Sequence, residues 1–577
     1  MPKNLLFLAA LAPALLSGAP ALRFEAEAPA ADWRHAMLTG NGTIGAMVEG
    51  NVSDELIHLS HAKLYLPMPA DGEKVGRDPF MAACNLRIAN DVNVAGGYRR
   101  SVDFATGECV VSAIDQEGRR YRRRIFASRP DNLIAVKIED PASRETFFVL
   151  DSIPLHGYRE AKTFEQGVRR FEVGKRDGCL TYRCEFSNRN PWNDIAGYVV
   201  ALAAGADKTE AFIAIEPVPK EGFASDPFPA IRKRLAAAVA DGYNKLLMRH
   251  AAAMGDLFGR VSLSIDCDDP RIERRFAAAR YNIISSTGGD NVPNLQGIWT
   301  GSWNEAWSSI FRENGHLPCA TAFFSRGNTM EFNECLAKWV ERKLKDPRHS
   351  WHKGAWRIPA RLRDAWRYNH DDAWLKRIEP LVKDAAERPE PDPEDVTALL
   401  EALYDDAPAE IVTNTTLVQI VRDAIDRGLD ERAAGAPETR KAFEYVRLGL
   451  AACKLGDAER AERCLMRLTD GFWTDGGGTF HLEDDVFNMD LSGGYPYLVS
   501  EMLVHGEDSW VRFLPAKPAS WREGSIKGLL LPGAVRIEEL LWEGDEWRAV
   551  LRLKDGETKV VTSEEYPHGV VWYERLK

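Results

Sequence analysis

Residues 230–261 read "AIRKRLAAAVADGYNKLLMRHAAAMGDLFGRV", and the chain changes character there. The apolar residues of this stretch recur at helical spacing, and nearly every segment from Arg271 onward keeps that period. Before it, short alternating runs such as "NLIAVKIED" and "GYVVALAAG" are separated by turn residues, which is typical of a β-sandwich. From Val511 short strands such as "EWRAVLRL" return. The sequence therefore predicts a β-domain, a helical domain and a small β-domain, in that order.

The expected domain boundaries follow from these changes. We expect a signal peptide at 1–21, a β-sandwich at 22–228, a helical linker at 229–268, a helical domain at 269–505 and a C-terminal β-domain at 506–577. Helical periodicity marks the candidate helices 271–285, 330–345, 355–368, 373–387, 395–404, 417–427, 439–455, 458–468 and 494–505. The stretch "RPEPDPED" at 388–395 is the clearest break inside the helical region.

Composition narrows the class of protein. The chain has 577 residues, 45% of them hydrophobic and 28% charged, as in an ordinary globular protein. Its net charge of −12 offers no basic footprint, so we expect no nucleic-acid partner. The arginine run "RRYRRRIF" at 119–126 alternates like a β-strand, and we interpret it as a solvated face, with an acidic sugar chain as the alternative ligand.

The N-terminus predicts export. "MPKNLLFLAALAPALLSGAP" carries one lysine, a short apolar run and then small residues, which is a secretory signal pattern. No other apolar run approaches membrane length, so we expect a secreted or periplasmic protein without membrane insertion. The nine cysteines are too few for a dense disulfide framework. Cys179 and Cys184 lie close enough in sequence to pair across a hairpin, and the others are expected to be buried.

A tryptophan-rich stretch is the first candidate for a binding site. Residues 291–309 read "NVPNLQGIWTGSWNEAWSS", and the proline and glycines in it favour a loop. Aromatic faces beside amides suit a sugar, which has flat C–H surfaces and many hydroxyls. The expected substrate-binding residues are Trp299, Trp303, Trp307, Asn294, Gln296 and Glu305. The alternative is that the tryptophans only plug the gap between two domains.

Four longer stretches carry a family resemblance. They are "TGNGTIGAMVEGNVSDELIHLSHAKLY", "ARYNIISSTGGDNVPNLQGIW", "FNMDLSGGYPYLVSEMLVHG" and "LPAKPASWREGSIKGLLLPGA". In this order they resemble glycoside hydrolase family 95, which contains alpha-L-fucosidases and related alpha-L-galactosidases. The resemblance implies an N-terminal β-super-sandwich, an (α/α)6-type helical barrel with the active site, and a C-terminal β-domain. It also implies a carbohydrate substrate and no cofactor.

The resemblance implies an inverting mechanism. In such a mechanism a glutamic acid protonates the leaving oxygen, and an asparagine polarised by an aspartate directs the water. The aspartate position matches Asp490 in "FNMD". In "SSIFRENGHLP", Asn314 matches the first of the two family asparagines, and His316 stands at the second. Glu410 in "DDAPAEIVTNTT" is the nearest match to the catalytic glutamate, offset by one residue.

The chain also departs from the family pattern. A Met-Asn-Tyr-Trp run is replaced by "CATAFF", and the His-rich segment before the aspartate has no counterpart. About nine candidate helices are fewer than a complete (α/α)6 barrel requires, so part of the barrel is predicted to be trimmed. Either the pocket is rebuilt for another substrate, or catalysis is lost and sugar binding is kept.

Without the family, the same residues support weaker hypotheses. Glu483, Asp484, Asp485 and Asp490 form a carboxylate cluster that is either a site for acid chemistry or a solvated acidic loop. His316 is either a general base or a packing residue. We found no zinc-ligand spacing, phosphate-binding glycine loop or nucleophile elbow.

Three functions follow, in order of preference. The first is an exported glycosidase that removes terminal alpha-L-fucosyl or related L-sugar residues with inversion. The second is a carbohydrate-binding protein on a degenerate barrel, and the third is a phosphorolytic enzyme. The first hypothesis adds that Asp490 accepts a hydrogen bond from His316, whose other nitrogen faces the water. If Glu410 lies elsewhere, Glu305 or Glu313 is the alternative acid. The sequence leaves the oligomeric state open.

Overall fold

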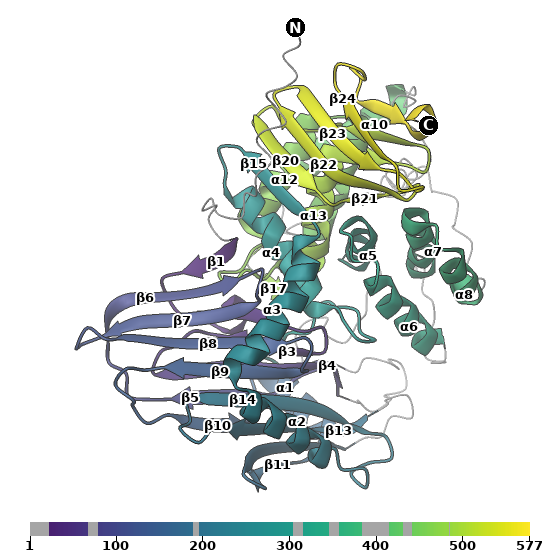
Figure 1. The fold of residues 1–577 in the computed structure, drawn as a ribbon. Coiled ribbons are helices and arrows are strands. Elements are labelled where there is room, and N and C mark those ends of the chain that lie inside the picture. Colours follow the sequence, from purple (N-terminus) through teal and green to yellow (C-terminus); the bar gives the residue numbers. More distant parts are fainter. Residues whose placement is uncertain are drawn as a thin grey trace.

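A computed structural model gives the fold of the chain. It describes residues 22–66, 79–187, 195–303, 316–344, 357–382, 415–430, 441–483 and 485–576. A helical region lies between two β-regions, which come from the N- and C-terminal parts of the chain (Figure 1). The predicted β, α, β order is confirmed at this level.

The N-terminal region is a β-sandwich. Its larger sheet has nine strands in the order β1 (Arg23–Ala26), β6 (Val94–Asp103), β7 (Glu108–Asp115), β8 (Arg120–Ser128), β9 (Leu133–Glu139), β14 (Glu210–Pro219), β13 (Ile195–Ala204), β12 (Cys179–Phe186) and β11 (Val168–Arg176). The smaller sheet has the order β10 (Phe147–Asp151), β5 (Phe80–Ala89), β4 (Asp54–Tyr65), β3 (Ile44–Val48) and β2 (Met37–Gly40). Alternate side chains, such as Val111 and Ile125, enter the core between the sheets.

The arginine run on β8 is not simply a solvated face, which corrects the sequence interpretation. Arg123 shares the inward face with Tyr121 and is fully buried, where it forms an ion pair with Glu55 of β4. Because side chains alternate along a strand, the neighbouring arginines point outward. Arg124 on that outer face pairs with Glu108 at 2.8 Å.

The predicted pairing of Cys179 with Cys184 is wrong. Both cysteines are free and lie on the single strand β12. Their odd spacing places them on opposite faces of the sheet. Cys184 enters the core between the sheets, and Cys179 packs in a second core under the helices α2 and α3.

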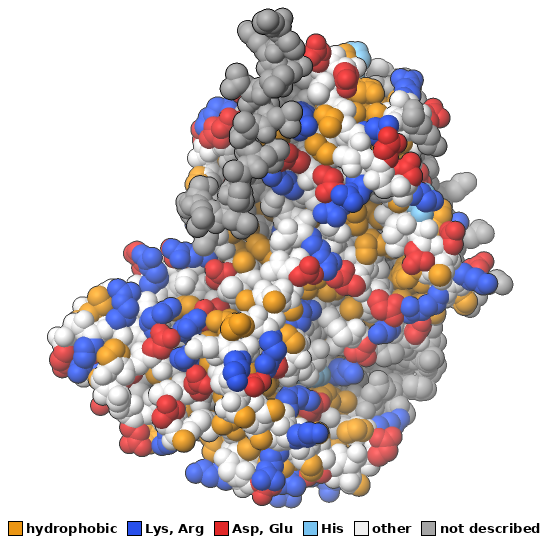
Figure 2. All heavy atoms as spheres, viewed as in Figure 1, with side chains coloured by type: hydrophobic (Ala, Val, Ile, Leu, Met, Phe, Trp, Pro, Cys, Tyr) orange, Lys and Arg blue, Asp and Glu red, His pale blue; other side chains and the backbone are white. Residues whose placement is uncertain are grey.

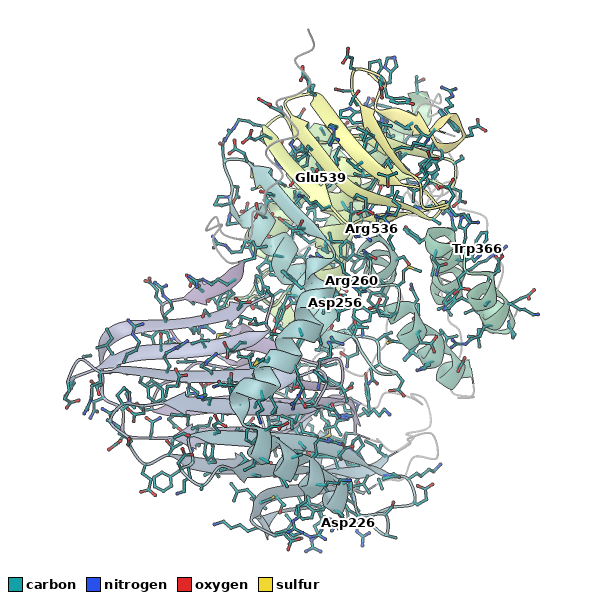
Figure 3. The ribbon with its side chains drawn as sticks, in the orientation of Figure 1. Asp226, Asp256, Arg260, Trp366, Arg536 and Glu539 are labelled. Carbon is teal, nitrogen blue, oxygen red and sulfur yellow. The ribbon has the colours of Figure 1, made fainter. Side chains whose placement is uncertain are left out.

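Two helices cover the outer face of the larger sheet. They are α2 (Phe228–Asp241) and α3 (Tyr243–Gly259), and a shorter helix, α1 (Tyr158–Gly167), precedes β11. Asp256 on α3 pairs with Arg260 at 2.6 Å (Figure 3). Arg260 also pairs with Glu331 at 2.7 Å. The region 229–268, expected as a helical linker, thus contains two helices that pack on the sandwich and then strand β15 (Ser262–Asp266).

The helical region is built around one buried helix, α13 (Asp490–Leu503), of which every residue is buried. The other helices are α4 (Arg271–Ser286), α5 (His316–Arg326), α6 (Phe332–Leu344), α7 (Arg357–Asn369), α8 (Asp372–Val382), α10 (Thr415–Asp430), α11 (Ala442–Leu455) and α12 (Ala458–Gly471). Gly493 lets α5 approach, because a Cβ there would lie 2.6 Å from the backbone nitrogen of Ala320. The helices at 271–286, 442–455 and 458–471 confirm predicted segments, whereas α5 was not predicted.

The C-terminal region contains two small sheets. One has the order β15, β20 (Glu523–Lys527), β22 (Val535–Glu543), β23 (Glu546–Arg552) and β24 (Thr558–Thr562), with β21 (Leu530–Leu531) beside β22. The other has the order β18 (Val504–Gly506), β19 (Trp510–Phe513) and β25 (Val570–Trp572). Strand β15 pairs with β20, so the chain contributes to this sheet before it enters the helical region.

The surface mixes charges of both signs. On the face shown in Figure 2, Lys and Arg are interspersed with Asp and Glu over all three regions. Within the described residues, no helix is both long and apolar enough to span a membrane. The predicted helix 395–404 and the predicted signal peptide fall outside those residues.

Candidate active site

Asp490 is the central residue of the candidate site. It is the first residue of α13, and its side chain is 2% exposed. Its backbone N–H donates to the Asn488 side-chain oxygen at 2.5 Å, which satisfies a donor that the helix start leaves unpaired. The positive end of the helix dipole favours a carboxylate at this position. The helix start is therefore a favourable place for a buried carboxylate side chain.

His481 binds this carboxylate directly. Its Nδ1 lies 2.5 Å from Asp490 Oδ2, and the imidazole is almost as buried as the carboxylate. His481 lies on β16 (Phe480–Leu482), which forms a hairpin with β17 (Asp485–Phe487). The Phe443 ring of α11 lies 5.8 Å from the imidazole. The pair is thus formed by a hairpin and a helix start nine residues apart in sequence.

The tryptophan loop, which is the described part (291–303) of the tryptophan-rich stretch, adjoins the same helix start. The Met489 N–H donates to the Leu295 carbonyl at 2.7 Å, which connects the loop to the residue before Asp490. Asn294 is buried and donates through Nδ2 to the Tyr65 hydroxyl at 3.0 Å. Because Tyr65 ends β4, the sandwich contributes a residue next to the loop. Gln296, which is also buried, lies two residues further along.

Trp299 and Trp303 are fully buried. The Trp299 indole N–H donates to the Thr39 carbonyl at 2.9 Å, and that of Trp303 donates to the Ile153 carbonyl at 3.0 Å. Both tryptophans therefore fasten the loop to the sandwich, as the packing alternative expects. A contact between either side chain and a sugar stays a prediction.

The structure brings together only part of the predicted set. Glu410, Asn314, Trp307 and Glu305 lie outside the described residues, as does the alternative acid Glu313. His316 is the first residue of α5, but its side chain is not described. Its predicted hydrogen bond to Asp490 therefore stays a prediction. Among the described side chains, the histidine that contacts Asp490 is His481.

The carboxylates of the predicted cluster lie in different environments. Asp485 is 63% exposed and lies 3.8 Å from Arg34 at the surface, whereas Asp490 is buried. The Glu483 side chain packs against Gly471 at the end of α12. Asp484 lies outside the described residues.

Asn488 provides a second polar feature beside Asp490. It is buried, and its Nδ2 has no hydrogen-bond acceptor among the described residues. A buried donor without an acceptor is costly, so such an atom is a candidate to meet a water or a ligand oxygen. The site thus combines a fixed carboxylate with an unused amide donor. No group of three His, Cys, Asp or Glu side chains in the described ranges could hold a metal ion.

Sequence reasoning missed His481, Asn488 and Tyr65. His481 carried a weak signal, since "TFHL" alternates as a strand and places the histidine on the same face as Thr479, opposite Phe480 and Leu482. Its distance from Asp490 depends on how the hairpin folds back. Tyr65 is remote in sequence from every other residue of the site, so only the packing of the sandwich on the loop places it there.

Comparisons with known proteins relate the chain to glycoside-active proteins. A model of the glycosyl hydrolase family 65 N-terminal domain matches residues 24–77. Alpha-L-fucosidase 2 of Arabidopsis thaliana is 23% identical over 417 residues, and "Probable alpha-fucosidase A" of Aspergillus oryzae is 22% identical over 376 residues. These alignments cover 54% and 50% of this chain. They cover 48% and 51% of the relatives, so the chain spans about half the length of the curated relatives it matches.

The chain also resembles solved structures in its fold. "Putative kojibiose phosphorylase from human microbiome" superposes with a TM-score of 0.56, over 95% of this chain and 100% of that chain. The identity is 9%, so this likeness concerns the fold alone. It agrees with a β-sandwich followed by a helical region.

Proposed function

We propose that the chain is an exported glycoside hydrolase that removes terminal alpha-L-fucosyl or related L-sugar residues with inversion, on a trimmed (α/α)6-type barrel of the family 95 kind. The observation that carries the proposal is Asp490. The position that the resemblance assigns to the polarising aspartate is a buried carboxylate, at a helix start beside the tryptophan loop. The two fucosidase relatives support the same substrate class.

The chemistry needs two groups on opposite sides of the glycosidic bond. A water attacks the anomeric carbon while the bond to the leaving oxygen breaks, and an acid protonates that oxygen. In the proposal Glu410 is this acid, and Asn314, polarised by Asp490, orients the water. His316 in the second asparagine position would take the proton of the water. Inverting enzymes keep their two catalytic groups roughly 6.5–9.5 Å apart to admit the water.

The sugar is expected to bind beside the loop that carries Asn294 and Gln296. Asn488 beside Asp490 and Tyr65 beside Asn294 supply further polar groups. Hydroxyl-rich ligands need several such donors and acceptors, since each unmatched buried polar group costs affinity. Glu305 and Trp307, which lie outside the described residues, complete the proposed binding set, and the buried Trp299 and Trp303 hold the loop that carries it.

A substrate panel tests the proposal. The purified chain is incubated with fucosylated and L-galactosylated oligosaccharides, and released monosaccharide is followed by NMR. We expect the β-anomer to form first, because inversion of an alpha linkage produces it. Release of the α-anomer would refute inversion, and no release from any substrate would refute the hydrolase.

Two parallel measurements separate the alternatives. Turnover that requires added inorganic phosphate would favour the phosphorolytic hypothesis. Calorimetry that shows oligosaccharide affinity without turnover would favour the binding protein. The catalytic acid is identified by comparing kcat among three variants, Glu410→Gln, Glu305→Gln and Glu313→Gln.

The predicted export is tested with residues 1–21 fused to a reporter protein. We expect the reporter to appear outside the cytoplasm.

A further inference from the structure

The strongest unexplained feature of the candidate site is the pair of His481 and Asp490, and an inference from it rests on the proposed function. The resemblance assigns a role to the aspartate but none to a histidine in the hairpin. Yet the His481 Nδ1 is within 2.5 Å of Asp490 Oδ2, and both side chains are buried. Burying an ionisable pair is costly unless its geometry is closely matched, so the contact calls for an explanation.

The hairpin that carries His481 is held in place from three directions. Thr479 donates through its hydroxyl to the Asn488 carbonyl and lies 3.2 Å from the Ser492 hydroxyl of α13. From α4, Asn282 donates to the Gly477 carbonyl at 2.9 Å. These contacts leave the hairpin little freedom to move relative to α13. The position of the imidazole is therefore set by the fold, not by the pair alone.

The sandwich supplies the third direction. Arg100 of β6 is buried and donates to the Asp475 carbonyl at 3.3 Å and to the His35 carbonyl at 2.8 Å. His35 Nδ1 in turn lies 3.3 Å from the Asp475 backbone nitrogen. The loop before the hairpin is thus anchored to the N-terminal region. This anchoring couples the sandwich to the position of His481.

We propose that His481 is a positioning residue, which holds the Asp490 carboxylate in one orientation for the reaction. A carboxylate is planar, so a donor fixed on Oδ2 also fixes the direction of Oδ1. The backbone N–H of Asp490 is itself held by Asn488, so both ends of the residue are restrained. A polarising group must keep its direction, since a misplacement of about 1 Å can cost roughly 100-fold in rate.

Three substitutions separate this role from the alternatives. His481→Asn keeps an amide N–H at the place of Nδ1 but removes the far ring nitrogen. His481→Gln places its amide near the far nitrogen and removes the donor to Asp490. His481→Ala removes both. If His481 is a positioning residue, the His481→Asn variant keeps kcat close to the wild-type value. The Gln and Ala variants then lower kcat roughly 10- to 100-fold with little change in KM.

Two kinetic outcomes would overturn the proposal. In one, His481→Asn loses as much activity as His481→Ala, which means that the ring itself is needed. In the other, all three variants keep wild-type kcat, which means that the pair has no role. The exposed His568 provides the matched control, because His568→Asn is expected to change neither kcat nor KM. Thermal unfolding of every variant identifies any that fail to fold.

A spectroscopic readout tests the pair without any substrate. With ¹⁵N-labelled histidine, the wild-type protein is expected to show His481 with a proton on Nδ1 and a strongly downfield signal for it. The signal is identified by its loss in His481→Asn, and it is expected to vanish or shift in Asp490→Asn. A proton only on the far nitrogen would overturn the inference. If the wild type turns over no sugar, the proposed function fails, and this spectrum still decides the inference.

Discussion

His505 Nδ1 lies 2.6 Å from Glu501 Oε2, where α13 runs into the C-terminal strand β18. The same carboxylate binds Arg326 of α5 at 2.8 Å through its other oxygen. On the far side of the imidazole, Glu507 Oε1 lies 3.5 Å from Nε2, and Arg367 of α7 pairs with Glu507. This charged network joins three helices to the C-terminal region. Arg326 and Glu501 are buried, and His505 nearly so, whereas Glu507 and Arg367 are 23% and 31% exposed.

The network predicts a pH-dependent stability. Burial alone lowers the pKa of His505, but the charge and hydrogen bond of Glu501, with help from Glu507, raise it by more, so the net pKa is raised. Burial raises the pKa of Glu501, and Arg326 and His505 outweigh it and lower that pKa to about 2. The His505 contribution is therefore complete below its unfolded pKa of about 6.5 and is lost as pH rises through the folded value.

The Glu501 contribution has the opposite sign. It is present above the unfolded pKa of about 4.3 and is lost as pH falls toward the folded value. His505→Asn keeps a donor toward Glu501 but cannot titrate, so its cost in Tm should be larger near pH 6 than near pH 9. Thermal unfolding between pH 6 and pH 9 measures this loss in Tm, with His568→Asn as the control. An equal cost at both pH values would contradict the assignment.

Arg326 is predicted to be essential to the same network. Its guanidinium is 1% exposed and also donates to the Ser500 hydroxyl at 2.6 Å. Arg326→Met leaves Glu501 buried without this charge, which typically costs about 3–5 kcal/mol. Denaturant unfolding monitored by circular dichroism should show the loss. Arg548→Met, at an exposed position of β23, is the matched control and should cost little.

Gly45 is predicted to be needed for the contact between the sandwich and the tryptophan loop. A Cβ there would lie 2.6 Å from the Ile298 carbonyl oxygen and 2.9 Å from Trp299 Cδ1. Gly45→Ala should therefore overpack the contact at a cost of about 1–3 kcal/mol. Gly96→Ala is the control, because no atom lies within 4 Å of its added Cβ. Thermal unfolding followed by tryptophan fluorescence compares the Tm of the two variants. Equal Tm values would contradict the packing argument.

Asp490→Asn should lower kcat by roughly 100-fold or more, if Asp490 polarises the group that orients the water. The amide keeps the shape of the side chain but removes the charge that the helix start and His481 stabilise. Asp485→Asn is the matched control in the adjacent hairpin, because Asp485 is 63% exposed. Steady-state kinetics on the best substrate of the panel measure both. Equal activity of Asp490→Asn and the wild type would exclude Asp490 from the reaction.

Local periodicity was enough to predict the order of the regions and most helices. The apolar strand run in "NLIAVKIED" and the helical spacing of 442–455 reflect which side chains are buried, and both are visible in the sequence. The resemblance located Asp490, because its motif is contiguous. It could not show that His481 contacts the Asp490 carboxylate, since the folding of the hairpin brings these two side chains together. Helix α5 was missed because the sequence before His316 gives no clear N-cap signal.

The sequence by itself determined which residues are apolar at period 2 or 3.6, and hence a sandwich, a helical region and a second β-region. Only the tertiary structure decided the partners of the charged and aromatic side chains. The sequence pattern indicates a surface position for Arg123, but Arg123 forms an ion pair with Glu55 inside the sandwich. Trp299 was predicted to bind a sugar, but its side chain is buried against Thr39 and Gly45. The physical reason is that hydrophobic burial follows local pattern, whereas hydrogen bonds and ion pairs require matched atoms from segments that are distant in the chain.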